Sequence, residues 1–314
     1  MNSIRKTNIF SLLIVGIFLG VSFLLNVFPV LKKIDGTVWL AGCLFMAALV
    51  FCLALRKKPF SFMGFRKVSL KTIMLITAMT FLGMPFITFI NYISMMFSSN
   101  LVAGEIMQSI RENVGISLVT IAVIPALSEE IVYRGVILSG YREEDTSFKK
   151  IAASAFLFAA LHMNFNQMSY AFVLGMLMAV LVELTGSILP SIWMHFCING
   201  SSVFSVWQLK ISGQDMAQVA EKGMEEMMES PLTNLLRLAP AAAVSLMLIM
   251  AFLYWIAKTC GTTDIIGDWF FGKREARMVD ENNNPIYKRT RYLDVCYVLA
   301  IGFCLLVAIS VELS

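Results

Sequence analysis

The chain has 314 residues, of which 58% are hydrophobic and only 15% are charged, and its mean hydropathy is +0.75. Soluble globular domains carry about 25% charged residues, so this composition excludes an ordinary soluble protein. The formal net charge is only +4, and no basic cluster is interleaved with aromatic residues, so we expect no nucleic-acid partner. The composition instead predicts an all-α, polytopic membrane helix bundle.

Apolar runs divide the chain into about eight to nine transmembrane helices, because a span needs roughly 20 predominantly apolar residues. The first run is longer than the apolar part of a secretory leader, about 7–15 residues, so we interpret it as a span. The third run contains Gly83 and Pro85, which predict a kink or a re-entrant bend. The nine candidate spans cover about residues 8–29, 37–55, 70–97, 115–140, 148–163, 167–184, 188–208, 235–257 and 293–311.

Lysine and arginine are concentrated in the segments 56–71, 142–150 and 258–291. With nine spans, all three segments lie on the same side as Arg5 and Lys6. Because basic loops remain on the cytoplasmic side, we expect the N-terminus inside and the C-terminus outside. The chain is then a multi-pass protein, and we expect it in a bacterial cytoplasmic membrane in contact with lipid.

We expect one membrane domain over residues 1–314. Residues 214–229 differ from the spans, because methionines recur at helical spacing among five acidic residues. This pattern predicts an amphipathic helix. Such a helix either packs over the outer ends of the bundle or forms a lid for substrate.

Three ionisable residues interrupt the fourth predicted span, namely Glu129, Glu130 and Arg134. A charge at the bilayer centre costs at least about 2.5–3.5 kcal/mol, so each needs a partner or a function. Glu130 and Arg134 are four residues apart and share a helix face, so we expect them to pair. Glu129 is rotated by about 100° from Glu130 and is left without this partner. We therefore expect Glu129 to be functional and the other two to be structural.

The chain contains two histidines, His162 and His195, and both lie in predicted spans. Asn199 follows His195 by four residues on the same helix face, and Phe158 precedes His162 by four, which predicts an aromatic neighbour. At about 1.5 Å per residue, these histidines, Asn199 and Glu129 lie roughly 10–21 Å from the cytoplasmic ends of their spans. Residues of a single site must lie at similar depths in the membrane, so we expect these four residues to form one site.

A glutamate, two histidines and an asparagine, without a suitably placed serine or cysteine nucleophile, indicate activated water. Glu129 suits a general base, with His162 orienting the water. His195 and Asn199 suit hydrogen-bond donors to an oxyanion. A zinc site stays open as an alternative, with Glu129, His162 and His195 as ligands, although no HExxH motif is present. We therefore expect either no cofactor or a divalent metal such as zinc.

These residues form three motifs that resemble the signatures of the CPBP family (CAAX protease and bacteriocin-processing proteins, also called Abi). The motifs are Glu129-Glu130-x-x-x-Arg134, Phe158-x-x-x-His162 and His195-x-x-x-Asn199. The resemblance covers roughly residues 60–208 and leaves a linker and helix at about 259–314 as an addition. It implies an intramembrane endopeptidase in which Glu129 and His162 activate water while His195 and Asn199 form the oxyanion hole.

The resemblance also implies a peptide or protein substrate, such as a lipidated CAAX tail, a leader peptide, a bacteriocin precursor or a pheromone. Two alternatives stay open. The protein could be a non-catalytic immunity or scaffold protein that keeps the motifs, or a transporter in which an intramembrane carboxylate and histidine relay protons. A proton relay does not need an asparagine one turn from a histidine, so we favour the peptidase.

Overall fold

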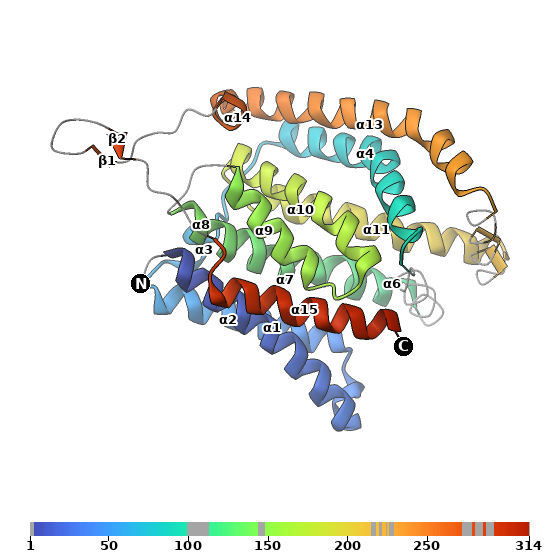
Figure 1. Ribbon diagram of the computed structural model, residues 1–314, viewed down its shortest axis with the longest axis horizontal. Coiled ribbons are helices and arrows are strands. Elements are labelled where there is room, and N and C mark those ends of the chain that lie inside the picture. Colours follow the sequence, from blue (N-terminus) through green and yellow to red (C-terminus); the bar gives the residue numbers. More distant parts are fainter. Residues whose placement is uncertain are drawn as a thin grey trace.

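The structure is a computed structural model (Figure 1). It describes residues 3–98, 113–143, 148–214, 229–271 and 292–313, with 218–219, 222–223, 225, 278–279 and 285–286. Helices dominate the described residues, and the short strands β1 (Met278–Val279) and β2 (Pro285–Ile286) form one antiparallel pair. The all-α membrane bundle predicted from composition is confirmed. The amphipathic helix predicted at 214–229 lies largely outside the described residues.

Seven helical stretches in the described part of the chain are long and apolar enough to span a membrane. They are α1 (Ser3–Val27), α2 (Gly36–Ala54), α4 (Leu70–Met95), the composite helix Val114–Arg142, α10 (Phe165–Thr185), α13 (Pro231–Cys260) and α15 (Val295–Leu313). The other two predicted spans correspond to α9 (Lys149–Ala160) and α11 (Leu189–Ile211). Shorter elements are η1 (Pro29–Lys33), α3 (Pro59–Phe62) and α14 (Thr263–Phe271).

The composite helix is not regular along its length. It consists of α6 (Val114–Ser117), the π-helical segment η2 (Leu118–Val123), α7 (Ile124–Glu130), a second π-helical segment η3 (Ile131–Leu138) and α8 (Ser139–Arg142). π-Helical turns are rare and are frequent at functional sites. Here they lie on both sides of the two glutamates that end α7.

Residues 148–163 do not form a full span, and this part of the prediction needs correction. α9 has only 12 residues and is about 18 Å long, less than the hydrocarbon core of about 30 Å. The chain turns at Met163, whose φ of 51° lies in the left-handed region. Asn164 then caps α10, its side chain accepting a hydrogen bond from the Gln167 amide. His162 therefore lies in a turn and not within a helix.

Two of the closest helix pairs join segments that are distant in sequence, and a third joins the consecutive helices α9 and α10 (Figure 1). α13 lies along α4, α9 lies along α10, and α15 lies along α1. α3, α8 and α14 lie at the end of the bundle that also carries the N-terminus, whereas the C-terminus lies at the opposite end. The described parts of the segments 56–71 and 142–150 thus lie at one end of the bundle, and the orientation of the chain across the membrane stays a prediction.

The helix α4 bends along its length but continues through Pro85 (Figure 1). Ser245 of α13 supports this region, because its hydroxyl donates to the Leu82 carbonyl at 2.8 Å and accepts from the Phe86 amide at 3.3 Å. A hydroxyl inserted in this way replaces the local i to i−4 hydrogen bond, a recognised cause of helix bending. The expected kink is thus part of a continuous helix.

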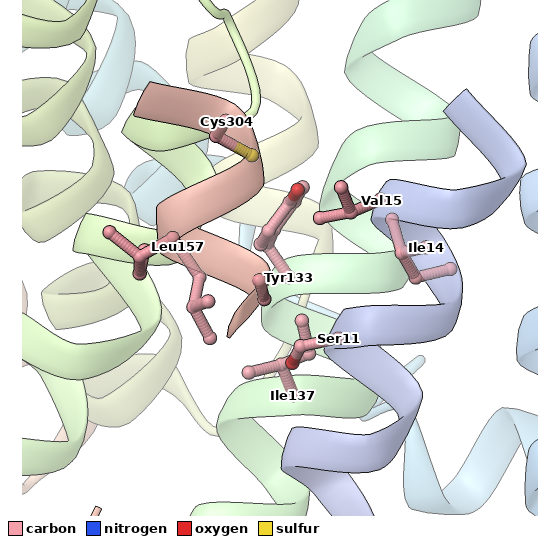
Figure 2. A pocket seen from close by; sticks show the side chains of 9 residues that line it. Ser11, Ile14, Val15, Tyr133, Ile137, Leu157 and Cys304 are labelled. Atoms are coloured by element: carbon pink, nitrogen blue, oxygen red, sulfur yellow. The ribbon is translucent and has the colours of Figure 1, made fainter. Parts of the chain in front are cut away.

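The C-terminal helix α15 packs against α1 and against α9, the helix that carries Phe158. Side chains of α1, η3, α9 and α15 converge on a cavity of about 10 Å³ (Figure 2), enough for about one water molecule. The lining residues include Ser11 of α1, Tyr133 of η3, Leu157 of α9 and Cys304 of α15. α15 is therefore packed into the bundle and does not lie apart from it.

The contact between α8 and α1 provides a test of this packing. A Cβ atom added at Gly140 would overlap Thr7 Oγ1. We predict that Gly140→Ala destabilises the protein by about 1–3 kcal/mol through overpacking. Gly42→Ala is the matched control, because nothing lies within 4 Å of a Cβ there, and a glycine in a helix gains up to about 1 kcal/mol on replacement by alanine. Thermal unfolding in detergent measures both, and equal effects would contradict the packing.

Candidate active site

A fully buried ion pair lies at the centre of the candidate site. Arg134 Nη1 donates to Glu130 Oε1 at 2.8 Å, and neither side chain is exposed to solvent. Arg134 Nη2 donates to the Gly175 carbonyl of α10 at 3.0 Å, and the guanidinium lies 4.3 Å from the centre of the Phe158 ring. The ion pair expected from the four-residue spacing is therefore present, with a backbone carbonyl and an aromatic ring as further partners.

Gly175 allows α10 to approach the arginine closely. A Cβ at this position would lie 3.1 Å from the Phe158 ring and 3.2 Å from the Ala155 Cβ. Both distances are shorter than ordinary van der Waals contacts. The absence of a side chain therefore lets the Gly175 carbonyl reach Arg134 without displacing Phe158.

Glu130 has a second partner, which the sequence did not reveal. His195 Nδ1 lies 3.0 Å from Glu130 Oε1, the same oxygen that binds Arg134. His195 is 94% buried. Its other ring nitrogen, Nε2, lies 3.9 Å from Glu129 Oε2. The two adjacent glutamates thus approach opposite nitrogens of one imidazole ring.

Glu129 differs from Glu130 in its environment, as the helical rotation predicted. Its side chain is 27% exposed, yet its Oε2 atom is buried and makes no hydrogen bond among the described residues. His162 is close enough to Glu129 to interact with it electrostatically. A buried carboxylate oxygen without a hydrogen bond is costly. Glu129 therefore has one oxygen without a hydrogen bond in the described structure, 3.9 Å from His195 Nε2.

Phe158 holds the two histidines and the arginine in place. The His162 ring meets it edge to face at 4.9 Å between centroids, and the His195 ring lies 6.0 Å away at a similar angle. The Phe158 carbonyl also lies 3.0 Å from His162 Nδ1. Such edge-to-face pairs stabilise by about 0.5–1.5 kcal/mol beyond burial of area. The aromatic neighbour expected for His162 is present, and it also contacts the rest of the site.

Asn199 lies one helical turn beyond His195 on α11. Its Nδ2 atom donates to the Ile121 carbonyl of η2 at 3.0 Å. A side-chain amide has two N–H groups, so one remains after this contact. α11 begins at Leu189, close to the predicted start at about residue 188, because Gly186 ends α10 with φ 66° and Pro190 lies in the first turn of α11.

The sequence left a metal site open as an alternative to metal-free activation of water. Within the part of the chain that the structure describes, no three His, Cys, Asp or Glu side chains are placed so that they could hold a metal ion. Glu129, His162 and His195 lie near one another, but they do not form such a group.

The fold and the site define a multi-pass membrane protein with a buried glutamate–histidine site in its helix bundle. Residues 111–201 match the family described as Type II CAAX prenyl endopeptidase Rce1-like. This segment contains all three motifs, so the resemblance to the CPBP family of membrane proteases is confirmed there. No curated protein and no solved structure gives a significant match to the chain. The family is a protease family, and it implies a peptide or protein substrate in the membrane.

The buried pair can be tested by removing one partner. We predict that Arg134→Gln destabilises the protein by about 3–5 kcal/mol, because Glu130 is left buried without a cation. Lys57→Gln is the control, since the Lys57–Glu143 pair is partly exposed and such pairs contribute about 0–1 kcal/mol. Thermal unfolding in detergent compares the two. A loss for Arg134→Gln no larger than the control's would contradict the role of the pair.

Proposed function

We propose that this protein is an intramembrane endopeptidase in which Glu129 activates water for attack on a peptide bond. The observation that carries the proposal is the Glu129 Oε2 atom, which is buried, makes no hydrogen bond in the described structure and lies 3.9 Å from His195 Nε2. Glu130 is already occupied by Arg134 and His195. The Glu130 Oε2 atom is also buried without a hydrogen bond in the described structure, but the Glu130 carboxylate is held in the ion pair with Arg134, so we assign the proton transfer to Glu129.

In the proposed reaction, water binds between Glu129 and His162. Glu129 removes one proton while the water oxygen attacks the carbonyl carbon, and the carbonyl oxygen becomes an oxyanion. The free N–H of Asn199 and a protonated His195 donate hydrogen bonds to that oxyanion. The intermediate then collapses, the carbon–nitrogen bond breaks, and Glu129 returns its proton to the leaving amine.

We infer that the substrate is a CAAX-type peptide with a lipidated cysteine near its C-terminus. The description of the matched family supports this class. The membrane setting is compatible with it, because apolar side chains of α7 and α11, among them Leu127 and Trp193, are exposed on the surface. A substrate that carries a hydrocarbon chain can reach such apolar surface from the bilayer.

We predict that Glu129→Gln and His162→Ala each slow cleavage at least about 10²-fold, because general acid–base catalysis contributes about 10²–10⁴. Cleavage of a prenylated CAAX peptide by the protein in liposomes is the measurement. Glu143→Gln is the matched control, since this carboxylate lies in an exposed ion pair with Lys57, and its rate should not change.

Unchanged cleavage in either variant would overturn the catalytic assignment. If the unmutated protein leaves prenylated peptides intact but cuts an unlipidated leader peptide, the substrate class is wrong and the site stands. If it cuts neither, the endopeptidase proposal fails.

We further predict that cleavage needs no metal ion. Treatment with a chelator followed by dialysis should leave the cleavage rate unchanged. A loss of activity that added zinc restores would instead support Glu129, His162 and His195 as ligands.

A further inference from the structure

Both histidines have an acceptor at the same ring nitrogen. His162 Nδ1 lies 3.0 Å from the Phe158 carbonyl, and a carbonyl oxygen can only accept a hydrogen bond. His195 Nδ1 lies 3.0 Å from Glu130 Oε1, which also accepts from Arg134 at 2.8 Å. A carboxylate paired with arginine is likewise an acceptor only. The partners therefore require hydrogen on Nδ1 in both rings.

We propose that Glu130 is a positioning residue for the peptidase reaction proposed above, because it keeps a proton on His195 Nδ1 and directs Nε2 toward Glu129. The backbone of Phe158 has the same effect on His162. Both Nε2 atoms are then left for the reactants. This inference depends on the proposed function for its catalytic consequence, but the position of the proton is independent of it.

The position of the proton limits what His195 can do. In a neutral ring with hydrogen on Nδ1, the Nε2 atom has only a lone pair and cannot donate to an oxyanion. His195 donates from Nε2 only after it binds a second proton. The Glu130 carboxylate stabilises the resulting imidazolium, as a buried carboxylate does for the histidine of a serine protease triad.

The geometry separates this role from simple neutralisation of Arg134. Pairing with the arginine alone requires no contact with α11. Glu130 instead uses the same oxygen for Arg134 and for His195, which are contributed by η3 and α11. Arg134 in turn is fixed by the Gly175 carbonyl and the Phe158 ring. The position of His195 thus depends on Glu130, and Glu130 is itself fixed by Arg134.

The chain offers a direct measurement, because it has only two histidines. Protein labelled with ¹⁵N-histidine has two rings to observe by NMR in lipid, and His162→Gln leaves His195 alone. We expect a protonated Nδ1, with Nε2 either bare or protonated. A neutral ring with hydrogen on Nε2 and a bare Nδ1 would overturn the proposal.

Glu130→Gln tests the catalytic consequence. An amide can donate or accept, so both neutral tautomers of His195 should be populated. We expect kcat for the prenylated peptide to fall at least about 10²-fold with little change in KM, as when a supporting carboxylate is removed from a catalytic histidine. Ser128→Ala is the control, because this neighbouring hydroxyl donates to the Ile124 carbonyl of its own helix, and it should change neither result.

An unchanged kcat in folded Glu130→Gln would overturn the positioning role. If this variant does not fold, the spectrum of the His162→Gln protein still decides the position of the proton. A protonated Nδ1 in a protein that cleaves no peptide would refute the proposed function and leave the arrangement of protons intact.

Discussion

Two charged side chains that are completely removed from solvent, Glu130 and Arg134, determine how the rest of the site is built. Removing a charge from water costs several kcal/mol, and a pair recovers this only with good geometry and further hydrogen bonds. The structure supplies them through the Gly175 carbonyl, the Phe158 ring and His195. Because each of these partners comes from a different helix, the pair fixes how those helices meet.

This constraint explains why adjacent glutamates have different roles. Glu130 is completely buried and pairs through Oε1 with both Arg134 and His195, whereas the Glu129 side chain is 27% exposed and its Oε2 atom lies 3.9 Å from His195 Nε2. In each glutamate the Oε2 atom is buried without a hydrogen bond in the described structure. π-Helical segments lie on each side of α7, the helix that ends with these two neighbouring carboxylates. α15 packs against α1 and α9 and helps to line the small cavity beside Tyr133 of η3.

The membrane helices and the buried ion pair could be predicted from the sequence, because the bilayer constrains strongly which residues it can contain. Apolar runs located the helices, and the four-residue spacing identified the Glu130–Arg134 pair. The span predicted over residues 148–163 was too long, because the left-handed turn at Met163 has no glycine or proline that would reveal it in the sequence. The contact between His195 and Glu130 was missed because it joins residues 65 positions apart, and only tertiary packing determines such contacts.

We propose that the buried ion pair serves catalysis, and that folding requires only that neither charge is left buried alone. Replacing both together, as Glu130→Leu with Arg134→Met, removes two buried charges and leaves neither unpaired, and such exchanges are often neutral or stabilising. Cleavage of the prenylated peptide in liposomes, with Tm measured in parallel, is the decisive experiment. We predict a Tm at or above that of the unmutated protein and cleavage slowed at least about 10²-fold, because His195 loses its acceptor. A folded double variant that cleaves at the original rate would contradict the claim.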